Sequence, residues 1–353
     1  MNHSTEQLDP VRAPSPDQPD GTRSGVHWAA SIMPIVERFG LLILLVAVVV
    51  FFAVYPATSQ IFPTMANFKN IAANEAVLIV VALAVLVPMV AHRFDLSAGA
   101  VVALASIAAA KATTSMELPL AVGVVVGIGV GLVVGLVNGA LIAYCRANSL
   151  VITLGMSTLL IGAGAYWSGY QTLVGVPQSL TSFGSGFWLN VPKSVWLVVC
   201  VALGVSYLLG MTVYGRRLLS IGSNESAANL VGMPVQRTVM TAFAVSGGLA
   251  GLAGVLLLAR TGSAASGVGT GYLLPALAAI FLGSTTIRPG RFTVAGTLTG
   301  VFFVAVSING LTLAGTEDWV EPVFNGGAVI VAVAISSLLT HRRLTGSPRQ
   351  YKC

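Results

Sequence analysis

Residues of the types that perform catalysis are few in this chain, and they form no familiar catalytic constellation. The sequence has no HExxH zinc motif, no GxSxG nucleophile motif and no GxxxxGKS or GxxxxGKT phosphate-binding loop, and no lysine follows a glycine anywhere. The cysteines, Cys145, Cys200 and Cys353, are too far apart in sequence for a CxxC zinc site. We therefore expect no enzyme, no metal site and no cofactor on this chain, and no ATP hydrolysis through a phosphate loop of its own.

Two carboxylates, Glu75 and Asp95, lie within or at the edge of apolar stretches. A charge at the centre of a membrane costs about 2.5–3.5 kcal/mol on insertion scales, so such a group is a candidate for function by default. Glu75 lies near the end of its stretch and could instead extend to the water. Asp95 could stabilise the start of a helix or pair with Arg93.

Polar and small residues inside the apolar stretches offer two further kinds of site. Glycine recurs at every fourth position from Gly123 to Gly139, which predicts a smooth helix face for close packing or for a sliding gate. The candidate gate or packing residues are Asp95, Ser97, Gly99, Gly131, Gly135, Gly283 and Gly296. The candidate pathway residues are Glu75, Asn138, Trp167 and Asn309. The three uncharged ones would suit a neutral, hydroxyl-rich solute or else bond neighbouring helices.

The polar stretch 215–237 carries strong local helix signals. It contains an asparagine that can cap a helix, a glutamate in the first turn, two alanines, and a glycine followed by a proline that ends the helix. The residues concerned are Gly222, Asn224, Glu225, Ala227, Ala228 and Gly232. They predict a helix of about seven residues, ~10 Å long. Because it has no wide apolar face for lying on lipid, we favour docking into a groove of a partner protein.

The elements that must position these residues are strongly apolar. Of 353 residues, 55% are hydrophobic and only 8% are charged, and the mean hydropathy is +0.86. Ordinary globular proteins have about 25% charged residues, so a water-soluble fold could not cover its surface with these. The composition predicts an all-α, polytopic membrane helix bundle.

About ten apolar blocks are long enough to cross a ~30 Å hydrocarbon core. Each must be helical, because lipid offers no partner to an open backbone and the alternation of a barrel is absent. The expected spans cover roughly residues 39–56, 71–91, 95–112, 118–144, 150–169, 194–214, 237–259, 271–287, 292–313 and 322–340. The third and eighth are the shortest.

The basic residues predict that both termini are cytoplasmic. With ten spans, fourteen of the eighteen Lys and Arg residues fall on the side of the termini, as the positive-inside rule requires. The net charge of +6 is spread over single residues and pairs, which argues against nucleic acid as a partner. The expected domains are a disordered cytoplasmic tail at 1–36, a membrane domain at 37–341 with the cytoplasmic loop 215–237, and a basic cytoplasmic tail at 342–353.

Several motifs, in order, resemble the permease subunits of bacterial ATP-binding-cassette importers, specifically the ribose-type family for monosaccharides. The matching segments are 92–99 (HRFDLSAG), 135–155, 221–228, 277–283, 290–291, 296–297 and 309–311. The resemblance covers nearly everything after the N-terminal tail. Serines stand at Ser223 and Ser284, where the family usually has a second glycine, and its Gly-Gly-Arg-Gly turn reads Pro-Gly-Arg-Phe at 289–292.

This resemblance implies a pore of two permeases, either two copies or one copy with a paralogue, embedded in the lipid of the bacterial inner (plasma) membrane. Cassette ATPase subunits would bind ATP on the cytoplasmic side, and a periplasmic substrate-binding protein would deliver the sugar, with 222–232 as the coupling helix. The outer segment 170–193 could receive that protein or form an aromatic belt. Two alternatives stay open: a permease of the same class for branched-chain amino acids or a signalling sugar, and an ion-coupled secondary carrier, which would place carboxylates near mid-membrane.

Overall fold

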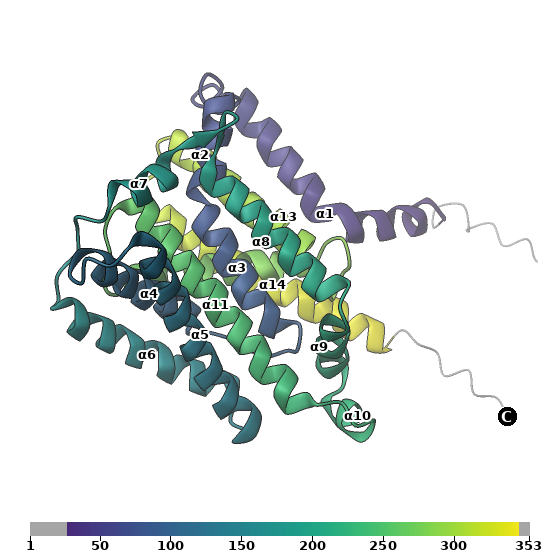
Figure 1. Ribbon diagram of the computed structural model, residues 1–353. Coiled ribbons are helices and arrows are strands. Elements are labelled where there is room, and N and C mark those ends of the chain that lie inside the picture. The colour runs from purple at the N-terminus through teal and green to yellow at the C-terminus, as the bar shows by residue number, and fades with distance from the viewer. Residues whose placement is uncertain (1–26, 346–353) are drawn as a thin grey trace, which may run out of the picture.

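The computed structural model describes residues 27–345, with the side chains of residues 39–334. Within this part of the chain the fold is helical, apart from two strands of two residues each, as the composition predicts (Figure 1). The helices are α1 (His27–Val54), α2 (Met65–Asn74), α3 (Ala76–Met89), α4 (Ala98–Thr114), α5 (Leu120–Tyr144), α6 (Ser149–Ser168), α7 (Gln178–Ser185), α8 (Lys193–Gly210), α9 (Val213–Ser223), α10 (Glu225–Leu230), α11 (Val235–Thr261), the 3-10 helix η1 (Val268–Tyr272), α12 (Leu273–Ser284), α13 (Val294–Leu313) and α14 (Val320–Thr345). The strands β1 (Phe187–Trp188) and β2 (Val191–Pro192) pair antiparallel.

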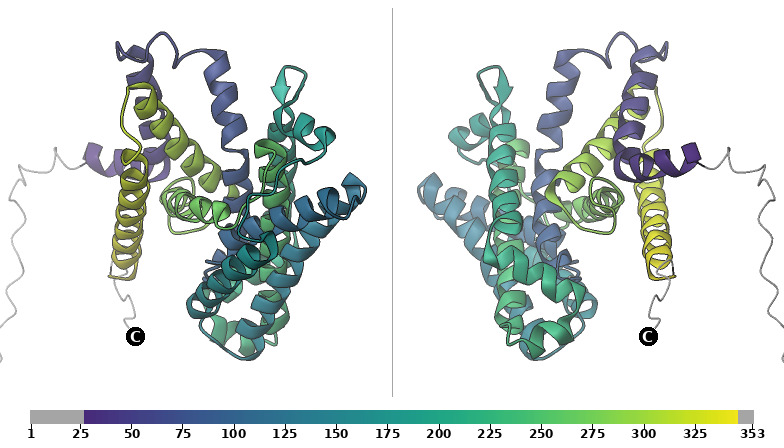
Figure 2. Two further views of the ribbon diagram at one scale, coloured as in Figure 1. Left: turned by 90° about the vertical axis from the view of Figure 1, so that its left-hand side faces the viewer. Right: turned by 90° about the vertical axis from the view of Figure 1, so that its right-hand side faces the viewer.

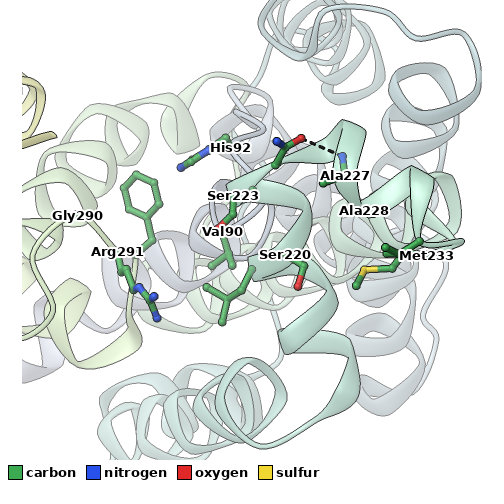
Figure 3. A pocket seen from close by; sticks show the side chains of 14 residues that line it. Val90, His92, Ser220, Ser223, Ala227, Ala228, Met233, Gly290 and Arg291 are labelled. Atoms are coloured by element: carbon green, nitrogen blue, oxygen red, sulfur yellow. Dashed lines mark hydrogen bonds between the residues drawn. The ribbon is translucent and has the colours of Figure 1, made fainter. Parts of the chain in front are cut away.

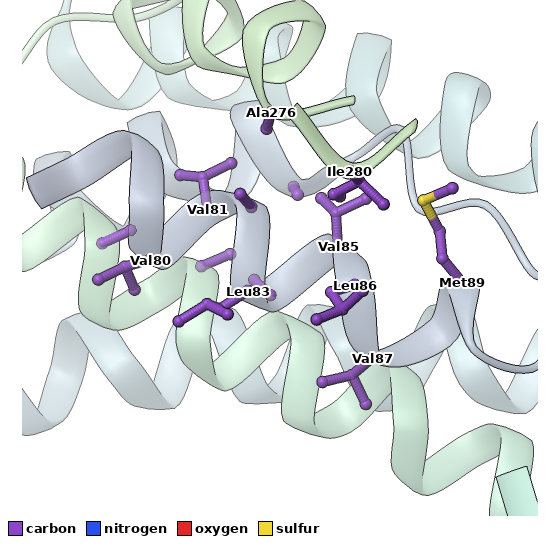
Figure 4. Packing of buried hydrophobic residues seen from close by; sticks show 14 of the residues in the cluster. Val80, Val81, Leu83, Val85, Leu86, Val87, Met89, Ala276 and Ile280 are labelled. Carbon is purple, nitrogen blue, oxygen red and sulfur yellow. The ribbon is translucent and has the colours of Figure 1, made fainter. Parts of the chain in front are cut away.

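Helix α3 is the centre of the core. Every residue from Ala76 to Met89 is buried, and the helix is apolar on all sides, which is the pattern of a helix enclosed by other helices. It contacts α11, α12, α8 and α13. Figure 4 shows Val80, Leu83 and Leu86 packed among these neighbours. An all-round apolar sequence therefore marks the interior of the bundle.

Two groups of helices lie on either side of α3. One group consists of α4, α5, α6 and α11, where the most extensive contact is between α5 and α11. The other consists of α1, α12, α13 and α14, in which α12 packs against both α13 and α14. Figure 2 shows the two groups diverging, with α3 reaching between them.

The candidate membrane spans follow the apolar blocks. Among the described residues, α5, α6, α8, α11 and α13 are each long and apolar enough to cross a membrane. Helices α2 and α3 reach this length together but are bent by 44° at Glu75. The shorter apolar helical segments are Phe39–Val54, Ala98–Thr114, Val268–Ser284 and Val320–Ala334. Each of these segments overlaps one of the ten expected blocks, and the count of ten and the cytoplasmic termini stay predictions.

The ends of the membrane domain differ from the expected boundaries. Helix α1 begins at His27, within the segment expected as a tail, and α14 continues to Thr345. The rest of both expected tails, at 1–26 and 346–353, lies outside the described residues. The polar loop 215–237 also differs, because it contains most of the helix α9 in addition to the expected short helix.

Candidate functional site

The short helix α10 forms where its capping residues predict it. The side-chain Oδ1 of Asn224 accepts a hydrogen bond of 2.9 Å from the backbone N–H of Ala227, while Asn224 itself has extended backbone angles. Glu225 occupies the first turn, where a negative charge is favourable. After the helix, Gly232 takes a φ of 75°, a left-handed value that suits glycine. Local sequence therefore sets where this helix starts and ends.

The tip of α10 is exposed and apolar. Leu230 and Val231 are 88% and 71% exposed, whereas Ala228 is buried against the rest of the chain. Large apolar side chains displayed on a short projection are typical of a surface that another protein covers. This exposure agrees with docking of α10 into a partner.

Helix α9 connects α8 to α10 and was not expected as a separate helix. Thr212 caps it by accepting a hydrogen bond of 3.2 Å from the backbone N–H of Gly215. Its buried face is formed by Leu218 and Ile221, three residues apart, and this spacing together with the threonine cap is a signal in the sequence. Burial also raises the pKa of the Tyr214 phenol on this helix, so that group stays uncharged at neutral pH.

Close backbone contact joins α9 to the end of α3. A Cβ atom added to Gly222 would collide with the backbone carbonyl oxygen of Val90. Gly222 is one of the candidate coupling residues. Because it has no side chain, the backbone of α9 can approach the end of α3 at this position. The backbone of α9 thus lies directly against the end of the central helix.

A cavity of about 490 Å³, which we call the α10 groove, lies beside the short helix (Figure 3). Its walls come from α9, α10, the end of α3 and the turn before α13. The labelled lining residues are Val90, His92, Ser220, Ser223, Ala227, Ala228, Met233, Gly290 and Arg291. Ser223 and the turn 289–292, where the sequence departs from the family pattern, thus lie at one groove.

An ion pair fixes α10 to the segment between α3 and α4. The Nη2 of Arg93 lies 2.6 Å from Oε2 of Glu225, with the two side chains 27% and 45% exposed. At that exposure a pair contributes about 0.2–1 kcal/mol, so it positions α10 more than it stabilises the fold. The sequence suggested Asp95 as a possible partner of Arg93, and this alternative is wrong. The partner of Arg93 is Glu225, which lies 132 positions further along the chain.

Asp95 belongs instead to a buried polar network. Its Oδ1 accepts hydrogen bonds from the backbone N–H and the hydroxyl of Ser97, at 3.1 and 2.6 Å, and its Oδ2 accepts one of 2.8 Å from the hydroxyl of Ser246. Asn138 donates from Nδ2 to Oγ of Ser97 at 2.9 Å. All four residues are buried. The network joins the start of α4 to α5 and α11, and Ser246 is a member that the sequence did not single out.

The glycine candidates are points of close helix contact. A Cβ atom at Gly131 or Gly135 on α5 would collide with the backbone of α11. In the same way Gly283 of α12 meets Gly296 of α13, and Gly99 of α4 meets the backbone of η1. The packing interpretation of these residues therefore has a direct physical basis.

The pathway candidates lie apart from one another. Glu75 sits at the bend between α2 and α3, and its neighbour Asn74 accepts a hydrogen bond of 2.7 Å from Arg260. Asn309 on α13 accepts a hydrogen bond of 2.9 Å from Asn67 on α2. Trp167 lies in the last turn of α6 and is 36% exposed. Asn138 belongs to the Asp95 network. None of the four lines the α10 groove or either of two further cavities, one beside α8 and α13 and one beside Arg93 and Arg146.

Comparison with known proteins adds a second line of argument. Residues 67–334 match the family described as branched-chain amino acid transport system / permease component. Ribose import permease protein RbsC of Escherichia coli (strain K12) is 31% identical over 297 residues, which is 83% of this chain and 92% of that protein. The probable ABC transporter permease protein YphD of the same strain is 32% identical over 299 residues, 85% of this chain and 90% of that protein.

A third relative widens the range of solutes in this group. The autoinducer 2 import system permease protein LsrD of Salmonella paratyphi B is 29% identical over 269 residues, which is 74% of this chain and 81% of that protein. No solved structure matches the chain. The matched region includes the Asp95 network, α9, α10, the first group of helices, and α12 and α13 of the second group, whereas α1 precedes it. The chain belongs to the permease family of ATP-binding-cassette importers that includes the ribose import permeases, and it is a non-catalytic transport subunit with several apolar membrane-spanning helices.

Proposed function

We propose that this chain forms the translocation pathway of an ATP-driven importer for a monosaccharide such as ribose. The observation that carries the proposal is the helix α10, which projects beyond the candidate spans, presents an apolar tip and is fixed to the core through Arg93 and Glu225. In this proposal α10 docks into a separate cassette ATPase, and the motion passes through α9 to α3. Gly222, Asn224, Glu225, Ala227, Ala228 and Gly232 form or support this coupling site.

The proposed assembly follows the family. Two cassette ATPase subunits bind ATP on the cytoplasmic side, and a periplasmic substrate-binding protein delivers the solute. The chain lies in the bacterial inner membrane with ten spans and both termini in the cytoplasm. Only 22% of the residues in the apolar 18-residue stretches of α5, α6 and α8 are buried, so these helices offer apolar surface to lipid and to a second permease, either an identical copy or a paralogue.

A neutral solute agrees with the charges of the described chain. Asp95 and Glu75, the two carboxylates considered for the spans, line neither the α10 groove nor two further cavities of the described chain; Asp95 is hydrogen-bonded to Ser97 and Ser246, and Glu75 lies at a helix break. A charged solute or a coupling ion would need unpaired charges at depth. The relatives named for ribose and for autoinducer 2 favour a sugar or a signalling sugar over a branched-chain amino acid, which is the transport system named in the family description.

The test is uptake by proteoliposomes that contain the full chain with its copurifying ATPase and substrate-binding protein. We expect ATP-dependent accumulation of labelled ribose, with autoinducer 2 and leucine as the alternative solutes. Accumulation that is driven by an ion gradient in the absence of the ATPase would overturn the proposal. Uptake of leucine alone would retain the ATP-driven mechanism and replace the substrate.

Charge exchange tests the part played by α10. Glu225→Lys places two positive charges at the contact with Arg93, so uptake should fall several-fold while the protein stays in the membrane. The double variant Arg93→Glu/Glu225→Lys restores an opposite-charge pair and should recover much of the lost uptake. Unchanged uptake in the single variant, or no recovery in the double variant, would reject the role of the pair.

A further inference from the structure

A cavity of about 350 Å³ lies between the end of α8, helix α9 and the start of α13. Three arginines line it, Arg216 from α9 and Arg288 and Arg291 from the turn before α13. Apolar side chains, among them Leu209 and Phe292, form the rest of its wall. We call it the arginine cavity. It shares part of its wall with the α10 groove but opens beside α8 and α13.

The cavity lies at the level of the membrane surface. Helices α8 and α13 are both candidate spans, and the cavity is lined by the last residue of α8, Gly210, and the first residue of α13, Val294. A span that ends at the cavity places it where the hydrocarbon gives way to headgroups. Its ligand must therefore be sought at that boundary.

The positive charge of the cavity is not neutralised within the described chain. No acidic residue lines it, and none of the three guanidinium groups forms an ion pair within residues 39–334. The carboxylates near this end of the bundle are already engaged, since Glu225 pairs with Arg93 and Asp95 accepts hydrogen bonds from serines. Three exposed arginines around one hollow are therefore left to attract an anion.

The shape and chemistry of the wall select among anions. The planar guanidinium group binds a phosphate with two parallel hydrogen bonds, which suits it better than a point charge would. Basic pockets between membrane helices bind the headgroups of anionic lipids, which the membrane supplies at high local concentration. The apolar part of the wall suits the glycerol and the first acyl carbons, and it offers nothing to a free inorganic phosphate.

We propose that the arginine cavity binds the phosphodiester headgroup of an anionic phospholipid. Bound there, the headgroup links Arg216 on α9 to the turn before α13. It thereby braces the helix that carries α10 against the second group of helices. Binding itself requires only that the chain lies in a membrane, so it can be tested apart from the transported solute.

The experiment is native mass spectrometry of the purified full-length chain in detergent, titrated with phosphatidylglycerol or with phosphatidylcholine of the same acyl chains. The cavity variant carries Arg216→Gln, Arg288→Gln and Arg291→Gln. We expect the wild type to prefer phosphatidylglycerol, and the cavity variant to bind it about tenfold or more weakly, because basic residues at the surface supply the attraction for an anionic lipid. Replacing the three arginines by lysine keeps the charge and should retain part of the preference.

A control variant separates a site from general attraction. Arg146→Gln, Arg217→Gln and Arg237→Gln remove the same charge from exposed positions outside the cavity, and binding should then weaken much less. Equal weakening in both variants would overturn the proposal, as would equal binding of phosphatidylglycerol and phosphatidylcholine by the wild type. Retained lipid binding with loss of the copurifying ATPase in the cavity variant would assign the arginines to that partner instead. A thermal melt of each variant checks that it is folded.

Discussion

Asp95 shows how a carboxylate is kept inside an apolar bundle. Removing such a group from water is costly, and hydrogen bonds to its oxygens offset part of that cost; here Oδ1 accepts from Ser97 and Oδ2 from Ser246. Asn138 then connects the same serine to α5. The network fixes the segment that leads into α4. Arg93, two residues before Asp95 in this segment, pairs with Glu225 of α10.

Replacing Asp95 should therefore destabilise the fold. Asp95→Ala leaves several buried donors without an acceptor, at about 1–3 kcal/mol for each unsatisfied group. We expect the melting temperature in detergent to fall further for Asp95→Ala than for Ser246→Ala, which removes one donor. Asp95→Asn keeps an acceptor oxygen and should be intermediate. Equal melting temperatures for all three variants would contradict the network.

Gly232 gives a second prediction at the scale of one residue. Its φ of 75° is strained for a residue with a side chain, at about 1–3 kcal/mol. We expect Gly232→Leu to disturb the end of α10 and to lower ATP-dependent uptake, with the protein still inserted in the membrane. Gly315→Leu imposes the same kind of strain at a φ of 87° far from α10 and should leave uptake near that of the wild type. Similar uptake in the two variants would remove Gly232 from the coupling site.

Among these side-chain contacts, those between residues close in sequence could be predicted, and those between distant residues could not. The cap of α10 by Asn224 was predictable, because donor and acceptor are three residues apart. The partners of Arg93 and Asp95 were not, since Glu225 and Ser246 are 132 and 151 positions away and only the packing of α9 and α11 brings them near. Local spacing predicts local contacts, whereas the ion pair and the network depend on the tertiary fold.

At the scale of the elements, α5 and α11 form the tightest interface. Their backbones approach where Gly131 faces Gly247 and Gly251, so neither helix has a side chain in the way. The four-residue glycine spacing predicted such an approach but not the partner helix. Sequence alone equally supported a sliding gate, and the contact with α11 is what the structure adds.

Alanine substitutions along α5 test this interface. Gly131→Ala places a methyl group against the backbone of α11, and overpacking of this kind costs about 1–3 kcal/mol. Gly129→Ala, on the same helix, meets nothing within 4 Å and should be neutral or slightly stabilising, because alanine favours helix over glycine. Thermal melts of both variants in the same detergent compare them. A loss of stability that is equal at both positions would contradict the assigned contact.

Helix α9 is the element that sequence reasoning overlooked. Its polar residues and paired arginines predict a loop between two spans, although Leu218 and Ile221 lie on one face of the helix. Its buried face becomes meaningful only against α3, where Gly222 permits contact with Val90. An amphipathic helix this short is stabilised mainly by what it packs on.

For the whole molecule, the composition predicted the apolar blocks and the helical fold. It did not predict how the helices are arranged around α3. A block that is apolar on every side can face lipid or protein, and hydropathy does not distinguish the two. The structure places α3 inside and leaves much of α5, α6 and α8 uncovered. The same apolar signal thus serves opposite positions in the bundle.

Cysteine labelling tests the expected orientation. Variants with a single cysteine would carry the natural Cys145 or an introduced Met116→Cys or Leu189→Cys, all at exposed positions. With cytoplasmic termini, Cys145 should react with a membrane-impermeant maleimide only in inside-out vesicles. The other two should react on intact spheroplasts, since α5 separates Met116 from Cys145 and α6 separates Cys145 from Leu189. The reverse pattern would invert the topology, and labelling of all three from one side would remove α5 and α6 as spans.

The enclosure of α3 limits how such a protein can change shape. A helix that touches both groups and has no free surface cannot tilt alone, so its neighbours must move in step with it. Helix α9 contacts the end of α3 at Val90, so a movement of α9 would act on α3 and, through it, on both groups of helices. We expect the bundle to switch as a single cooperative body, and small local openings to be rare.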